Sequence, residues 1–289
     1  MKILLTNATN YLGTLVTDQL IRLGHQIYSP APTQPSADHL RHLGVTPLFN
    51  STVEQALQAT ATTFDAIIID TATINEHLLN LLTTAFKDTN KPLLLLSSVA
   101  NQPVNITHAN TAQPTSMIFQ IAENIQQQLL DHHINTALIR LAPSTANLET
   151  HQGVLNQLVT LATKNGYSAY IGPGLNHWNV VDPQDAADLI TLVLTKLITD
   201  HPTMRQFNAI ANFSLTTKSI AITIGNFLHL PTVSIAPTIA SQYFGELTHL
   251  MTLNLTASST QTQQYLNWHP KTPDVSKSLA VSSYFWAFA

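Results

Sequence analysis

The chain has 289 residues, of which 44% are hydrophobic and 10% are charged, so it can bury a large core in one domain, with or without a small lobe. Its net charge of −4 gives no footprint for nucleic acid or an anionic membrane, and the lack of cysteine excludes disulfides and thiolate chemistry. No apolar stretch reaches membrane-span length. We therefore expect a cytoplasmic protein with no nucleic-acid or membrane partner.

The chain opens with an apolar run, a polar turn and a helical pattern between Met1 and Tyr28. A dinucleotide-binding turn carries glycine at three positions, for the tight turn, the approach of backbone to pyrophosphate, and the packing of helix on strand. Asn7, Asn10 and Gly13 occupy these positions here. Because Asn tolerates positive φ better than most residues, we expect the turn to persist, with the Asn10 side chain near the pyrophosphate.

The end of the next apolar run tests this interpretation. An acidic residue there would hold the ribose of NAD, and an Arg would favour NADP, but residues 28–33 contain neither. The turn alone therefore leaves open whether it binds a dinucleotide or nothing. The candidate cofactor-binding residues are Asn7, Thr9, Asn10, Tyr11, Leu12, Gly13 and Thr71.

The first half of the chain alternates short apolar runs with helical patterns. The runs are continuous, as is typical of strands buried on both faces of a parallel sheet, and they cover 2–6, 26–29, 46–49, 66–70, 92–97 and 136–141. This alternation predicts an α/β fold with a Rossmann-type doubly wound parallel sheet.

The second half has a different texture, with helices predicted at 154–164, 185–197 and 219–228 and strands at 169–171 and 207–211. We expect a single unit over 1–289, in which 1–145 is mainly the dinucleotide-binding core and 146–289 mainly a smaller C-terminal substrate lobe. His39 and His42 lie one helical turn apart, but no acidic residue completes a zinc pattern, so we expect no metal.

Several segments together resemble the extended and atypical short-chain dehydrogenase/reductase family, known as NAD-dependent epimerases/dehydratases. The N-terminus resembles the family's strand-TGATGxxG-helix, and 92–99 resembles the strand that ends in the active-site Ser. Further matches are Ala122-Glu123, the strand end at 139–144, and 172–181 followed by Asp185-Ala186-Ala187. The C-terminal motif Ser-x-x-Thr-x-x-x-Leu-Gly-Trp-x-Pro is matched by Ser259, Thr262, Leu266, Trp268 and Pro270, with Asn267 in place of Gly.

This resemblance implies NAD or NADP as cofactor and a homodimer formed through two helices of the sheet's face. It makes Ser97 and Ser98 the candidate catalytic residues. The candidate substrate-binding residues are Pro143, Asn176, His177 and Trp178. We expect Trp268, in the tail, to anchor the core rather than to contact a ligand.

The family's catalytic pair is missing from this sequence. A Tyr acts there as general acid/base and a Lys four residues later lowers its pKa, but counting back from Glu123 places Thr115 and Phe119 at these positions. Whether the chain is an enzyme is therefore left open. One hypothesis is an NAD(P)-dependent oxidoreductase or epimerase that acts on a small carbonyl or sugar-type substrate with a relocated acid/base. The other is a non-catalytic dinucleotide- or metabolite-binding protein, such as a redox sensor, and a site that binds no ligand is a third.

Overall fold

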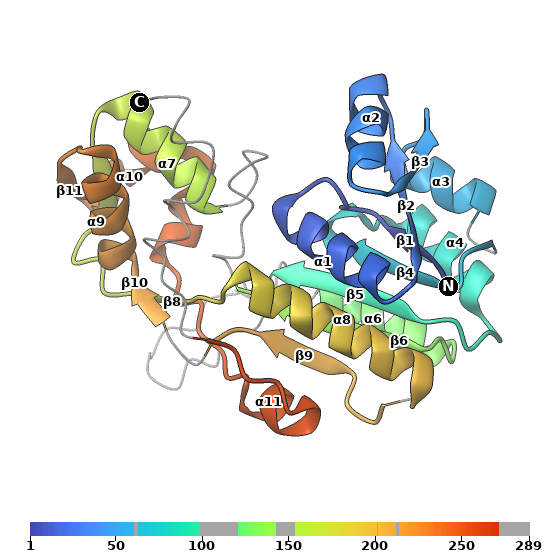
Figure 1. Ribbon diagram of the computed structural model, residues 1–289. Helices are drawn as coiled ribbons and strands as arrows, with labels where there is room; N and C mark the ends of the chain where they lie inside the picture. Colours follow the sequence, from blue (N-terminus) through green and yellow to red (C-terminus); the bar gives the residue numbers. More distant parts are fainter. Residues whose placement is uncertain (61–62, 99–120, 143–153, 201, 212–213, 272–289) are drawn as a thin grey trace.

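A parallel sheet of seven strands forms the centre of the protein (Figure 1). The computed structural model describes residues 1–60, 63–98, 121–142, 154–200, 202–211 and 214–271. The strand order is β3-β2-β1-β4-β5-β6-β9, and each neighbouring pair is parallel. The strands are β1 (Lys2–Leu5), β2 (Gln26–Ala31), β3 (Thr46–Phe49), β4 (Ala66–Asp70), β5 (Leu93–Ser98), β6 (Thr136–Leu141) and β9 (Gln206–Ala209).

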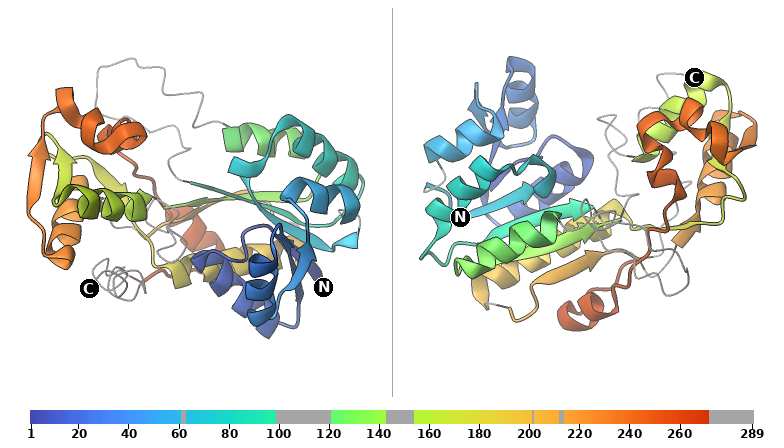
Figure 2. Two further views of the ribbon diagram at one scale, coloured as in Figure 1. Left: turned by 90° about the horizontal axis from the view of Figure 1, so that it is seen from above. Right: turned by 180° about the vertical axis from the view of Figure 1, so that it is seen from behind.

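Helices cover both faces of this sheet, as Figure 2 shows from above. One apolar core joins the sheet to α1 (Tyr11–Arg22), α2 (Gln34–His42) and α8 (Pro183–Thr199). A second core on the other face joins it to α3 (Val53–Thr60), α4 (Glu76–Phe86) and α6 (Ile121–Asp131). The short helix η2 (Thr71–Thr73) follows β4 directly. The doubly wound α/β sheet predicted from the sequence is confirmed.

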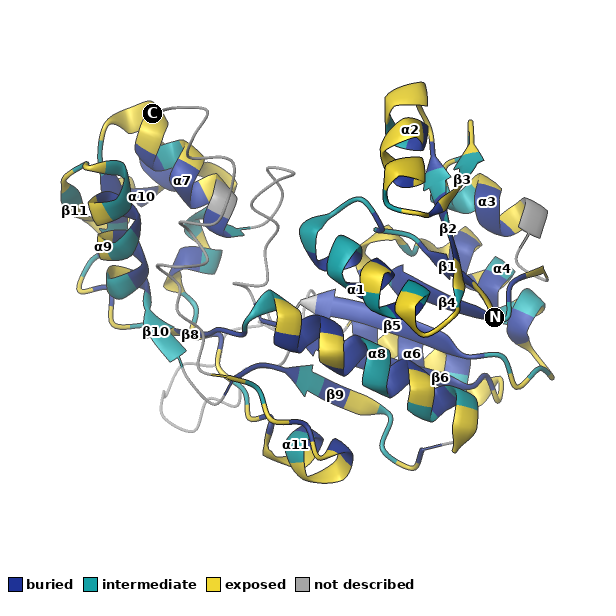
Figure 3. Ribbon diagram, in the orientation of Figure 1, coloured by how far each residue is buried: buried dark blue, intermediate teal, exposed yellow. Residues whose placement is uncertain are grey.

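A smaller lobe has a hydrophobic core of its own, seen as buried segments within it in Figure 3. In this lobe β7 and β11 pair in parallel, and β8 and β10 pair antiparallel. The lobe contains α7 (Val154–Asn165), β7 (Ser168–Ile171), β8 (His177–Asn179), β10 (Ser214–Thr216), α9 (Thr217–Leu228), β11 (Thr232–Ile235), η4 (Pro237–Ile239), α10 (Ala240–Phe244), η5 (Gly245–Thr248) and η6 (Leu250–Thr252).

The chain crosses between lobe and sheet more than once. After the lobe strand β8 it returns to the sheet for α8 and β9, and after η6 it returns again for α11 (Thr260–Leu266). Leu266 and Trp268 belong to the core that contains α1 and α8. The core of the sheet therefore also contains residues after 146, and the division of roles between 1–145 and 146–289 stays a prediction. In the described residues, every helix is too short or too polar to cross a bilayer.

The six strands predicted in the first half are confirmed, with ends that differ by no more than two residues. The short strands β8, β10 and β11 and the helix α2 were not predicted. These strands have three or four residues and several half-buried or exposed positions, so they carry no continuous apolar run.

Gly13 allows α1 to lie directly on the end of β1. A Cβ atom at this position would clash with the carbonyl oxygen of Asn7, which is backbone and cannot move aside. The same carbonyl accepts a hydrogen bond from Asn10 N at 3.2 Å, which closes the turn. The one glycine that the turn retains is therefore the one required for packing of helix on strand.

Two of the resembling segments bind each other at the start of α8. Trp268 is buried and its Nε1 donates to the Asp185 carbonyl at 3.1 Å, while Lys271 N donates to Asp185 Oδ2 at 2.7 Å. The expectation that Trp268 anchors the tail in the core is confirmed. Burial raises the pKa of Asp185, and the nearby charges of Asp182 and Asp188 raise it further, against the hydrogen bond from Lys271.

We expect Gly13→Ala to destabilise the protein by roughly 2–3 kcal/mol or more, since the added methyl group forces α1 away from β1. The free energy of unfolding in urea measures this effect. Thr14→Ala, one residue along the same helix, is the control and should change stability by about 0.5 kcal/mol or less. Equal stability of the two variants would contradict the packing role of Gly13.

We expect Asp185→Asn to alter how stability depends on pH. A carboxyl group whose pKa is raised on folding holds its proton more tightly in the folded protein, so its contribution to stability falls as pH rises from its ordinary value of 3.8 through the raised value. Urea unfolding across this range should show a smaller fall for Asp185→Asn than for the wild type. The exposed Asp131→Asn serves as control, and a fall of wild-type size in Asp185→Asn would contradict this account.

Candidate functional site

The strand order reverses direction between β1 and β4, which are the first strands of two runs that extend to opposite edges of the sheet. Such a reversal is called a topological switch point. In open α/β sheets, ligands bind beside the switch point, outside the carboxyl ends of the strands. The segments that leave these ends are the turn after β1 and η2 after β4. The carboxyl ends of β5 and β9 point to the side on which the lobe lies (Figure 1).

The turn after β1 is built differently from the expectation. The turn persists, as expected, but neither Asn7 nor Asn10 is among the described residues with positive φ, so tolerance of positive φ is not the reason. Asn10 has φ −82° and ψ 160°, and its Oδ1 accepts a hydrogen bond from Gly13 N at 2.6 Å. Asn10 is thus the N-cap of α1, a position that prefers extended backbone and a side-chain acceptor.

Asn7 reaches across the switch point to the end of β4. Its Nδ2 donates to Asp70 Oδ2 at 3.3 Å, and Asp70 Oδ1 accepts a second hydrogen bond from Ala72 N at 2.9 Å. Burial raises the pKa of Asp70, and these two hydrogen bonds oppose the rise. Asp70 was not among the predicted site residues, although a carboxylate at the end of a buried strand was the available signal.

The other predicted cofactor-binding residues belong to the segment from the turn to the start of α1 and to the start of η2. Leu12 is buried in the core, and Thr71 is buried at the start of η2. Thr9, in the turn, and Tyr11, the first residue of α1, are half-buried. The backbone of the first turn of α1, at Tyr11 and Leu12, is the part that suits an anion, because helix N-termini present N–H groups and a positive dipole end.

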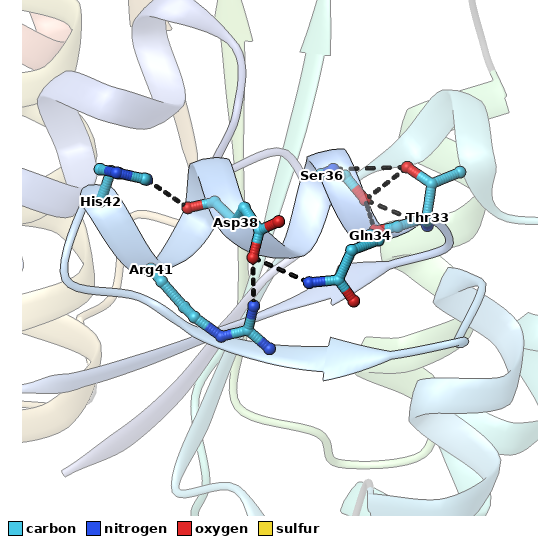
Figure 4. A network of polar contacts seen from close by, with 6 residues as sticks. All are labelled: Thr33, Gln34, Ser36, Asp38, Arg41 and His42. Carbon is cyan, nitrogen blue, oxygen red and sulfur yellow. Dashed lines mark hydrogen bonds and ion pairs between the residues drawn. The ribbon is translucent and has the colours of Figure 1, made fainter.

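The end of β2 forms a helix cap, shown in Figure 4. Thr33 is the N-cap of α2, and it exchanges hydrogen bonds with Ser36 in a capping box. Further along α2, Asp38 accepts from Gln34 at 2.8 Å and binds Arg41. After the end of β2, where a ribose-binding residue is expected, the capping side chains therefore carry hydroxyl groups. The carboxylate of Asp38 is paired within α2.

The candidate catalytic serines lie at the end of β5. Ser97 is buried and stands opposite Arg140 in the register with β6, and Ser98 stands opposite Leu141. Thr115 and Phe119, which replace the family's Tyr and Lys, fall outside the described residues, as does Pro143.

Glu123 and Arg140, from two resembling segments, form a partly buried ion pair. Arg140 Nε donates to Glu123 Oε1 at 2.8 Å, and Arg140 Nη2 donates to Gln206 Oε1 at 2.7 Å. This pair joins α6 to β6 and β9. Glu123 and Arg140 therefore stabilise the packing of α6 on the sheet.

Two of the candidate substrate-binding residues of the lobe bind the backbone of residues 251–253. Asn176 Nδ2 donates to the carbonyls of Met251 and Leu253, and the buried Trp178 donates from Nε1 to Leu253 at 3.1 Å. His177 is exposed, and its Nδ1 lies 3.1 Å from Ser214 Oγ. Packing accounts for Asn176 and Trp178, and the binding role of all three stays a prediction.

Asn179, the next residue, forms hydrogen bonds to two other segments that connect the lobe with the sheet. Its N–H donates to the Leu255 carbonyl at 2.9 Å, and its Oδ1 accepts from Ala257 N. Its Nδ2 donates to the Ala211 carbonyl at 3.5 Å, so segments before α8, after β9 and before α11 meet at one buried amide.

No protein-family model matches the chain. The uncharacterized protein C2A9.02 of Schizosaccharomyces pombe is 27% identical over 301 residues, which cover 99% of this chain and 100% of that protein. The uncharacterized protein YLL056C of Saccharomyces cerevisiae is 24% identical over 288 residues, which cover 94% of this chain and 95% of that protein.

Solved structures resemble the whole chain. A dTDP-glucose 4,6-dehydratase of Bacillus anthracis in complex with NAD has a TM-score of 0.70 and 12% identity, covering 100% of this chain and 97% of its own. A UDP-glucose 4-epimerase of Thermotoga maritima with UDP-glucose has a TM-score of 0.71 and 13% identity. The match covers 100% of this chain and 99% of that epimerase. The chain has the fold of these epimerases and dehydratases.

Proposed function

We propose that this protein binds NAD or NADP at the carboxyl ends of β1 and β4 and acts as an oxidoreductase or epimerase on a small carbonyl or sugar-type substrate. The observation that carries the proposal is the close packing of Gly13 on the Asn7 carbonyl, which places the N-terminus of α1 at the switch point. The likeness to solved epimerases and dehydratases over the whole chain supports it.

The residues present fit parts of a dinucleotide. The first turn of α1 suits the pyrophosphate, and the buried Thr6 hydroxyl at the end of β1 has no hydrogen-bond partner within the described residues. Thr33 and Ser36 offer hydroxyl groups after the end of β2, where a ribose-binding residue is expected, but they favour neither NAD nor NADP. A bound nicotinamide would supply hydride transfer, whereas the protein supplies orientation and electrostatics.

Ser97 is the described residue that we propose to contact a substrate carbonyl. A serine hydroxyl is by itself a weak acid, and the positions of the family's acid/base pair hold Thr115 and Phe119, which cannot act as that pair. This observation favours the second candidate, a non-catalytic dinucleotide- or metabolite-binding protein of redox-sensing type.

A cytoplasmic location and a homodimer remain parts of the proposal. A dimer through α4 and α6 would cover Ile121 together with mostly polar side chains, because the exposed positions of α6 are Ile121, Asn124, Gln127, Gln128 and Asp131. Such an interface would depend on hydrogen bonds more than on apolar area.

Calorimetric titration with NADH and with NADPH tests the proposal. We expect the wild type to bind one of them, and the double variant Asn7→Gly and Asn10→Gly to bind more tightly, because it removes both side chains from the turn at a small cost in helix capping. Asn267→Gly is the control, since Asn267 is a left-handed helix cap on α11 that glycine also suits.

Absence of binding at millimolar concentration in the wild type and the double variant would contradict the proposal. Binding without turnover across a panel of carbonyl compounds and sugar nucleotides would select the non-catalytic candidate.

A further inference from the structure

We infer that Asp70 is a specificity-determining residue of the proposed site, whose carboxylate opposes the diphosphate of a dinucleotide and makes the binding of that dinucleotide depend on pH. The inference rests on the proposed function. It concerns which charge the site accepts, which the fold alone does not fix.

The register of the sheet places Asp70 beside the turn. Leu5 pairs with Ile68, so the same register brings Asn7 opposite Asp70, as the hydrogen bond between their side chains shows. Side chains two residues apart on a strand share a face. Asp70 therefore lies on the face of Ile68, which belongs to the core shared with α1.

The carboxylate and the helix thus act on an anion in opposite directions. The N-terminus of α1 attracts a phosphate, whereas a negative charge nearby repels it, and this repulsion is strong where water is partly excluded. Burial already raises the pKa of Asp70 in the free protein. A diphosphate would raise this pKa further, so its binding takes up a proton and weakens as pH rises.

The charged groups around this end of β4 do not offset Asp70. β1 and β5 pack against β4, α6 packs against η2, and α1 follows the turn. Lys2 lies at the amino end of β1, Asp18 pairs with Arg22, and Glu123 pairs with Arg140. The ionisable side chains in the described residues of these four elements are Lys2, Tyr11, Asp18, Arg22, Glu123 and Asp131.

Asp70→Asn tests the inference, because the amide keeps an acceptor for Ala72 N and loses the charge. We expect its affinity for NADH at about pH 8 to rise roughly tenfold over the wild type, and this gain to shrink as pH falls towards the raised pKa of Asp70. Asp65→Asn is the matched control, since Asp65 precedes the same strand at the opposite edge and binds Lys2 N. Its affinity should equal that of the wild type.

A second measurement uses the wild type alone, and it decides the matter if Asp70→Asn does not fold. Calorimetry of NADH binding in two buffers of different ionisation enthalpy should show net proton uptake. Wild-type binding with no proton uptake, and with an affinity that Asp70→Asn does not improve, would overturn the inference and leave the proposed function standing. Failure of all three proteins to bind NADH would overturn both.

Discussion

The contact between Gly13 and the Asn7 carbonyl is the constraint on which the arrangement of the site depends. Because no side chain separates α1 from β1, the first turn of the helix begins at the carboxyl edge of the sheet, beside the end of β4. Asn10 then replaces a flexible glycine with a cap on the same helix. The turn therefore keeps its shape by hydrogen bonding where a glycine-rich turn keeps it by conformational freedom.

Several residues that resemble family motifs have their partners within the chain. Glu123 of α6 binds Arg140 of β6, and Asp185 binds Trp268 and Lys271 at the start of α8. Such contacts preserve the fold whether or not a ligand is bound. The architecture is shared with enzymes at 12–13% identity, whereas the chemistry proposed for this site rests on Asp70, Ser97 and the turn.

The sequence predicted the sheet because buried parallel strands are continuous apolar runs that need no knowledge of their neighbours. It failed where structure depends on distant or unforeseen partners. Tolerance of positive φ did not indicate that the Asn10 side chain binds Gly13 N. The sequence also did not show that Asp70 binds Asn7, which is 63 residues away. The short strands β8 and β10 exist because each pairs with the other, and neither has a pattern of its own.

The buried amide of Asn179 has a consequence for how the protein unfolds. It joins segments on both sides of the boundary between lobe and sheet, so the lobe cannot detach without exposing a polar group that has lost its partners. Although lobe and sheet have separate hydrophobic cores, their unfolding is thereby coupled. Heating should melt the two in a single cooperative transition.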